Sequence, residues 1–151
     1  MVKKEAGKIV FGLIAGTIYV VFGLIQVVVG LGYGSGWTKA IFVPSDIAGG
    51  LILVLIGMVF LYGVKELNAG INEGVAYIYV GILLALGFTA IYLLIMGADA
   101  LEAYAIRSED FEDWAPLDDM KPGIYLGLLP FAALLAWRHK FSLKGLSRAG
   151  V

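Results

Sequence analysis

Four long stretches of this sequence contain no charged side chain, apart from Arg138 at the very end of the fourth, and they constrain the fold more than any other feature. They lie at about residues 9–31, 47–64, 75–98 and 123–138. An α-helix needs about 20 apolar residues to cross the ~30 Å hydrocarbon core of a bilayer. We therefore predict four transmembrane helices, one for each stretch.

The composition of the 151-residue chain agrees with a membrane protein. Hydrophobic residues make up 60% of it and charged residues 15%, whereas a soluble domain carries about 25% charged residues. One water-soluble core of this size could not bury so many apolar side chains. We predict a single all-α, polytopic integral membrane domain over residues 1–151, with its helices packed as a bundle. This class argues against a soluble enzyme, a secreted disulfide scaffold and a nucleic-acid-binding domain.

The fourth stretch is the shortest, and its passage across the membrane depends on its ends. The residues from Gly123 to Trp137 cover roughly 22 Å at ~1.5 Å per residue. The stretch can still span the bilayer if Arg138 and Lys140 extend their flexible side chains to the headgroups. A re-entrant or interfacial segment is the alternative. Pro130 is expected to kink this helix, because its ring removes one backbone hydrogen bond.

The other helix ends carry recognisable signals. Ser45 and Asp46 precede the second predicted helix and offer capping oxygens at its positive end. Residues 98–106 favour helix, so the third helix is expected to project beyond the membrane. Pro122 suits the first turn of the fourth helix.

Positively charged residues are concentrated on one side of the predicted topology. Eight of the eleven Lys and Arg residues precede the first span, separate the second from the third, or follow the fourth. Because cytoplasmic loops carry the excess of Lys and Arg, both termini are predicted to be cytoplasmic, which four spans allow. The loop at residues 99–121 is then outside, and the basic tail at 138–151 is cytoplasmic. The eight residues are Lys3, Lys4, Lys8, Lys65, Arg138, Lys140, Lys144 and Arg148.

Glycine recurs at intervals of about seven residues in the predicted helices. Residues seven apart drift only about 20° around a helix, so each set forms a smooth stripe. Small residues let helix backbones approach closely in lipid. We interpret the stripes as packing surfaces between the helices of one chain, with a dimer seam as the alternative. The candidate packing residues are Gly12, Gly16, Gly23, Gly30, Gly50, Gly57, Gly74, Gly81, Gly123 and Gly127.

Few polar side chains remain inside the predicted spans, which contain no Asp, Glu, Lys or His and no Arg before Arg138. Gln26 is expected to form a hydrogen bond between helices. Proton and sodium carriers normally keep an ionisable group within the membrane, so the composition argues against a self-sufficient pump or antiporter. The candidate polar interior residues are Gln26, Thr17, Thr89 and Tyr92.

The predicted outer loop is strongly acidic, with eight of the twelve Asp and Glu residues and only Arg107 and Lys121 to balance them. Such a surface can collect cations, or it can form a solvated cap or a docking surface for a partner, which is the interpretation we prefer. Ser108 begins a predicted capped turn, followed by Phe111 and Trp114 as an interfacial anchor. The candidate acidic surface consists of Asp99, Glu102, Glu109, Asp110, Glu112, Asp113, Asp118 and Asp119.

The sequence carries no catalytic signature. Cysteine is absent and His139 is the only histidine, so we expect no catalytic residue, no metal site and no cofactor. We predict a non-catalytic subunit of a larger cell-membrane complex, one that transports ions or solutes. Its expected partners are the lipid bilayer and other membrane subunits or further copies of itself, with no nucleic acid. The alternatives are a small homo-oligomeric channel or carrier and, less favoured, a membrane enzyme. The scarcity of amide residues and the lack of cysteine are typical of thermophile proteins, although membrane spans are poor in amides in any case.

Overall fold

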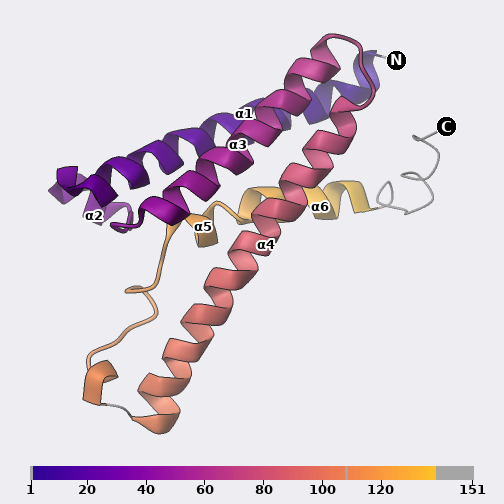
Figure 1. Cartoon of the computed structure of the whole chain (residues 1–151). Helices are drawn as coiled ribbons and strands as arrows, with labels where there is room; N and C mark the ends of the chain where they lie inside the picture. Colours follow the sequence, from indigo (N-terminus) through magenta and orange to yellow (C-terminus); the bar gives the residue numbers. More distant parts are fainter. Residues whose placement is uncertain (1, 108, 139–151) are drawn as a thin grey trace.

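The computed structural model of this chain describes residues 2–107 and 109–138, and every regular element in that part is helical (Figure 1). Two of the long helices continue into wider π-helical turns, and one short 3-10 turn lies in the long loop. The elements are α1 (Val2–Val28) with η1 (Val29–Tyr33), α2 (Gly36–Ala40), α3 (Ile47–Asn68), α4 (Gly74–Leu101) with η2 (Glu102–Ile106), η3 (Glu109–Phe111), α5 (Pro122–Tyr125) and α6 (Leu128–Trp137).

Within the described residues, three helices are long and apolar enough to cross a membrane: Glu5–Tyr33, Ile47–Asn68 and Gly74–Ile106. Each contains one of the first three predicted spans and extends it at one or both ends. The helix predicted for residues 98–106 is confirmed, because α4 continues through η2 as far as Ile106. The fourth predicted stretch, 123–138, corresponds to the shorter apolar segment Pro122–Trp137.

The helices α1 and α3 form a close antiparallel pair (Figure 1). A Cβ atom added to Gly57 would lie 2.7 Å from the carbonyl oxygen of Gly16, so the two backbones touch where both residues lack a side chain. Figure 1 shows α4 leaving this pair, with its outer half extending away from the other helices. Near its start, however, α4 is close to α3, since a Cβ at Gly74 would lie 2.6 Å from the carbonyl oxygen of Gly63.

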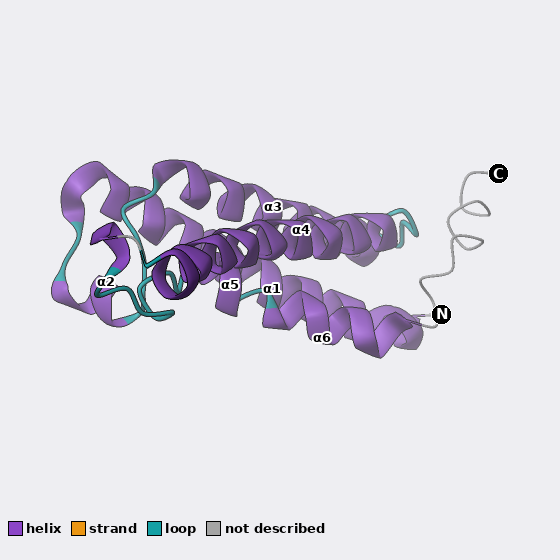
Figure 2. Ribbon diagram, turned by 90° about the horizontal axis from the view of Figure 1, so that it is seen from below, coloured by secondary structure: helices purple, strands orange, loops and turns teal. Residues whose placement is uncertain are grey.

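The segment formed by α5 and α6 runs antiparallel to α1 (Figure 2). The ring of Tyr125 lies 5.9 Å from that of Phe22, and the ring of Trp137 lies 5.4 Å from that of Phe11. The predicted kink is confirmed: the helix is interrupted between α5 and α6, just before the buried Pro130. Because proline has no N–H for a bond to the preceding turn, the helix starts anew. The described chain therefore ends beside the part of α1 where it begins.

The predicted glycine stripes lie between helices of the same chain. At each of the ten candidate packing glycines a Cβ would meet atoms of another helix, whereas nothing lies within 4 Å of one at Gly87 or Gly97. The buried centre between α1, α3 and α4 is filled by large side chains, among them Tyr19, Phe60 and Ile82. Large apolar residues are exposed around the outside of the bundle, as expected where lipid is the solvent.

Candidate functional site

A polar cluster joins α1, α3 and α4 at the end of the bundle opposite the chain's start. The Tyr92 hydroxyl donates a hydrogen bond to Oδ2 of Asp46 at 2.9 Å, and Nε2 of Gln26 donates to the same oxygen at 3.5 Å. The other carboxylate oxygen, Oδ1, accepts from the backbone N–H of Gly49 at 2.9 Å. One carboxylate thus connects three membrane helices.

The local sequence explains why the carboxylate lies here. Asp46 is the N-cap of α3, as predicted, and its extended backbone directs the side chain back over the first turn of the helix. Gln26 lies in the last turn of α1 before η1 and is 1% exposed. Tyr92 is buried on the face of α4 that packs toward these two residues. The cap therefore acts also as a contact between helices.

Gly49 makes room for the cluster. A Cβ atom at this position would contact Oδ2 of Asp46, and would lie 2.5 Å from the Tyr92 hydroxyl and 2.6 Å from Nε2 of Gln26. Any larger residue would occupy the space in which the three side chains meet. The sequence pattern did not identify this glycine, because it lies outside the seven-residue stripes.

The start of α5 covers the cluster. The ammonium group of Lys121 lies 5.2 Å from the centre of the Tyr92 ring, an arrangement that favours a cation–π interaction. A Cβ at Gly123 would lie 2.6 Å from the same ring, so only a glycine lets α5 approach this closely. The Thr89 hydroxyl, one turn below Tyr92, lies 2.7 Å from the carbonyl oxygen of Gly123 and 2.9 Å from that of Ala85.

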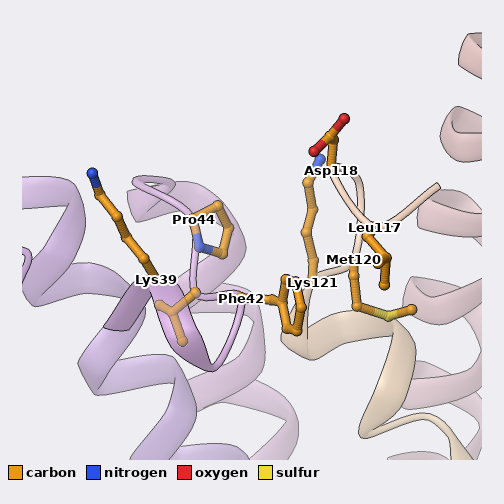
Figure 3. Close-up of a pocket in the computed structure, with 8 residues that line it drawn as sticks. Lys39, Phe42, Pro44, Leu117, Asp118, Met120 and Lys121 are labelled. Carbon is orange, nitrogen blue, oxygen red and sulfur yellow. The ribbon is translucent and has the colours of Figure 1, made fainter. Parts of the chain in front are cut away.

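Two surface hollows flank this end of the bundle. One, of about 280 Å³, is lined by Lys39 of α2, by Phe42 and Pro44 from the segment after α2, and by four residues from the segment before α5: Leu117, Asp118, Met120 and Lys121 (Figure 3). The other, of about 320 Å³, is lined by η1 and α2 residues together with Ser45, next to Asp46 in the chain. Both lie at the end of the bundle opposite the chain's start.

The structure brings together only some of the predicted polar interior residues. Gln26 and Tyr92 share the Asp46 carboxylate. Thr89 makes a separate contact with α5. Thr17 is exposed on α1 and belongs to neither contact. An exposed polar residue on a membrane helix cannot be distinguished from an interior one by residue type alone.

The predicted acidic surface forms part of the long loop and of the α4 projection. Asp118 accepts from the N–H of Ala115 at 2.8 Å, and Asp119 accepts from the indole N–H of Trp114 at 3.0 Å, so these acids stabilise turns. Asp99 lies beside Asp119 and Lys121. Within the described part of the chain, no three His, Cys, Asp or Glu side chains are arranged to hold a metal ion. Ser108, at the predicted capped turn, lies outside the described residues.

Sequence reasoning missed three members of the site. Asp46 was recognised only as a cap, Lys121 only as a loop charge, and Gly49 was not recognised. One signal pointed toward Asp46: a buried amide such as Gln26 needs a partner, and the nearest acid at a span end was Asp46.

Known proteins place the chain in a family. The model of the MJ0565 integral membrane domain matches residues 3–139. A relative from Methanocaldococcus jannaschii, the uncharacterized protein MJ0565, is 30% identical over 119 residues, which cover 78% of this chain and 80% of the relative. No solved structure matches the chain significantly.

Proposed function

Since the chain belongs to the family of the MJ0565 integral membrane domain and is a multi-pass membrane protein, we propose that it is a non-catalytic subunit of a larger membrane complex, one that transports ions or solutes. The observation that carries this proposal is the outer part of α4. With η2, this helix extends over the 33 residues from Gly74 to Ile106. Its length of about 50 Å exceeds the hydrocarbon thickness of a bilayer by far.

The projecting end of α4 exposes large apolar side chains next to charges. Leu101, Tyr104 and Ile106 are 62%, 64% and 70% exposed. All three follow Asp99 in the chain, and Glu102 lies between Leu101 and Tyr104. The two acids keep this part of the helix out of the hydrocarbon core. Exposed apolar surface that lies outside the lipid is typical of a contact with another protein. These three apolar residues form the proposed docking end of α4.

Charge supports the same assignment. The loop at residues 99–121 has eight acids against Arg107 and Lys121, so it suits a partner whose outer face is basic. Complementary charge would steer the partner toward the apolar docking end and set its orientation.

We propose four membrane passages with both termini in the cytoplasm. Two observations support this topology. The segment of α5 and α6 runs antiparallel to α1. The excess of Lys and Arg lies, in the sequence, before the first span, between the second and third spans and after the fourth. The fourth passage is short, and its basic residues after Trp137 would reach the headgroups by snorkelling.

The proposal is tested by the mass of the particle extracted from native membranes in mild detergent. We expect co-purifying subunits, and we expect Leu101→Ser combined with Ile106→Ser to release the chain from them. Leu31→Ser combined with Tyr33→Ser changes similarly exposed residues of η1, which continues α1, and should leave the complex intact. If the wild-type chain migrates alone, at 16.1 kDa plus its micelle, the proposal is wrong.

A small homo-oligomeric carrier or channel is the second candidate, and one observation favours it. Asp46 places a carboxylate between helices near the outer end of the bundle, which the composition of the spans alone did not indicate. Ionisable groups in such positions often serve ion pathways. Flux of ions into liposomes that contain only this chain would favour the carrier over the subunit.

A further inference from the structure

The cluster of Gln26, Asp46 and Tyr92 has more hydrogen-bond acceptors than donors. Oε1 of Gln26 is buried and accepts no hydrogen bond from any described residue. The negative charge of Asp46 is met by the neutral donors of Gln26, Tyr92 and Gly49. We propose that this cluster is a binding site for a small monovalent cation such as Na⁺. The carboxylate of Asp46, the amide oxygen of Gln26 and the hydroxyl oxygen of Tyr92 are its ligands.

The distances suit such an ion after one small change. The O and N positions of an amide exchange when its plane turns over by 180°. In Gln26 this turn puts the free Oε1 where Nε2 now lies, 3.5 Å from Oδ2 of Asp46. Two oxygens at this separation subtend about 90° at a cation that binds oxygen at about 2.4 Å, a distance usual for hard cations. The hydrogen bond that this turn breaks is weak, because its donor and acceptor lie 3.5 Å apart.

The charge of the site favours a monovalent over a divalent ion. Asp46 supplies one negative charge, and the described residues contain no group of three acids or histidines that could hold a metal as a cluster. The charged groups that face the cluster are Asp46 at the start of α3 and Lys121 at the start of α5. Gln26 and Tyr92, from α1 and α4, are neutral. Among the described residues, Lys8 and Glu5 form an ion pair within 4.0 Å, whereas Lys121 and Asp46 do not. Lys121 therefore does not neutralise Asp46 by direct pairing.

An entry route lies beside the site. Asp46 is partly exposed, and the neighbouring hollow of about 320 Å³ is lined by Ser45 and Val29. The hydroxyl of Ser45 lies 3.5 Å from the carbonyl oxygen of Val29, so polar oxygens continue from the hollow toward the cluster. An ion that reaches Asp46 through this hollow passes Lys39, which also lines it.

The experiment measures binding of ²²Na⁺ to the purified full chain in detergent, at constant ionic strength with choline as the replacement cation. We expect saturable binding, close to one ion per chain, and a rise in the thermal unfolding midpoint with NaCl but not with choline chloride. Asp46→Asn should weaken binding at least tenfold, although asparagine still caps the helix. Tyr92→Phe keeps the ring against Gly123 and should weaken binding several-fold. Asp118→Asn, in the outer loop, should bind like the wild type.

Lys121→Gln provides an independent check on folded protein. Removing this neighbouring positive charge should strengthen Na⁺ binding several-fold if the ion sits beside Asp46. The proposal is overturned if the wild-type chain shows no saturable ²²Na⁺ binding, or if Asp46→Asn folds and binds as well as the wild type. Stabilisation by acid alone, with no effect of Na⁺, would identify a proton site and would also overturn it. Because the isolated chain is measured, the result does not depend on whether the chain is part of a complex.

Discussion

Gly23 of α1 and Gly50 of α3 pack backbone against backbone: a Cβ on Gly23 would lie 2.7 Å from the carbonyl oxygen of Gly50, and one on Gly50 2.8 Å from that of Gly23. Gly16 and Gly57 repeat this relationship two turns away. In lipid, the burial of apolar surface contributes little free energy to helix association. The dispersion energy of such close backbone contacts stabilises the pair instead.

Gly23→Ala should therefore destabilise the protein, because the new methyl group meets backbone atoms that cannot move aside without separating the two helices. We expect a loss of about 1–3 kcal/mol, the usual cost of overpacking. Thermal unfolding in detergent measures it, with Gly87→Ala as the control, since a Cβ there has nothing within 4 Å. Equal midpoints for the two variants would contradict the packing described for α1 and α3.

Gly49→Ala should disturb the polar cluster more than the glycine contacts between α1 and α3. The methyl group would take the place where the side chains of Asp46, Tyr92 and Gln26 meet. We expect a stability loss of about 1–3 kcal/mol from overpacking, together with a loss of Na⁺ binding. Gly97→Ala, on the same end of the molecule but in open space, is the control. A Gly49→Ala protein that retains both properties would show that the cluster is looser than described.

Thr89→Val should loosen α5 from α4. The variant keeps the shape of the side chain but removes the hydroxyl that lies 2.7 Å from the carbonyl oxygen of Gly123. Interhelical hydrogen bonds in membrane proteins contribute about 0.6 kcal/mol on average and at most ~1.7. The free energy of unfolding, measured by thermal unfolding in detergent, should decrease by an amount within that range. Thr17→Val, at an exposed position, should leave the unfolding midpoint unchanged.

The proposed topology predicts which surfaces are reachable from outside the cell. The chain has no cysteine, so a thiol reagent can label only the single cysteine that is introduced. Glu112→Cys, in the long loop, should react with an impermeant thiol reagent in intact cells. Asn72→Cys, in the turn between α3 and α4, should react only after permeabilisation.

A third position tests the fourth passage. Ser147→Cys, outside the described residues, should be protected in intact cells if the segment of α5 and α6 crosses the membrane. Labelling of both Glu112→Cys and Ser147→Cys would mean that this segment does not cross. Labelling of Asn72→Cys but not of Glu112→Cys would reverse every assignment of side.

The positions of the helices and their close-packing glycines could be predicted from residue order, because both depend on local properties. An uncharged run of about 20 residues must be helical in lipid, where every backbone hydrogen bond has to be made internally. Seven-residue spacing places Gly16 and Gly23 on one face of any helix, whatever that helix packs against. The N-cap role of Asp46 is likewise local, since the bond to Gly49 spans three residues.

The sequence by itself thus determined the class of the protein, its helical segments and the stripes along which they pack. Only the tertiary structure decided which stripes meet, that α4 leaves the bundle, and that Asp46 faces Gln26 and Tyr92. The reason is physical: Gln26 and Tyr92 lie 66 positions apart, and whether their side chains meet depends on the rotation and crossing of three helices. Those angles follow from the sum of many small packing contacts, and no single residue type in the sequence specifies them.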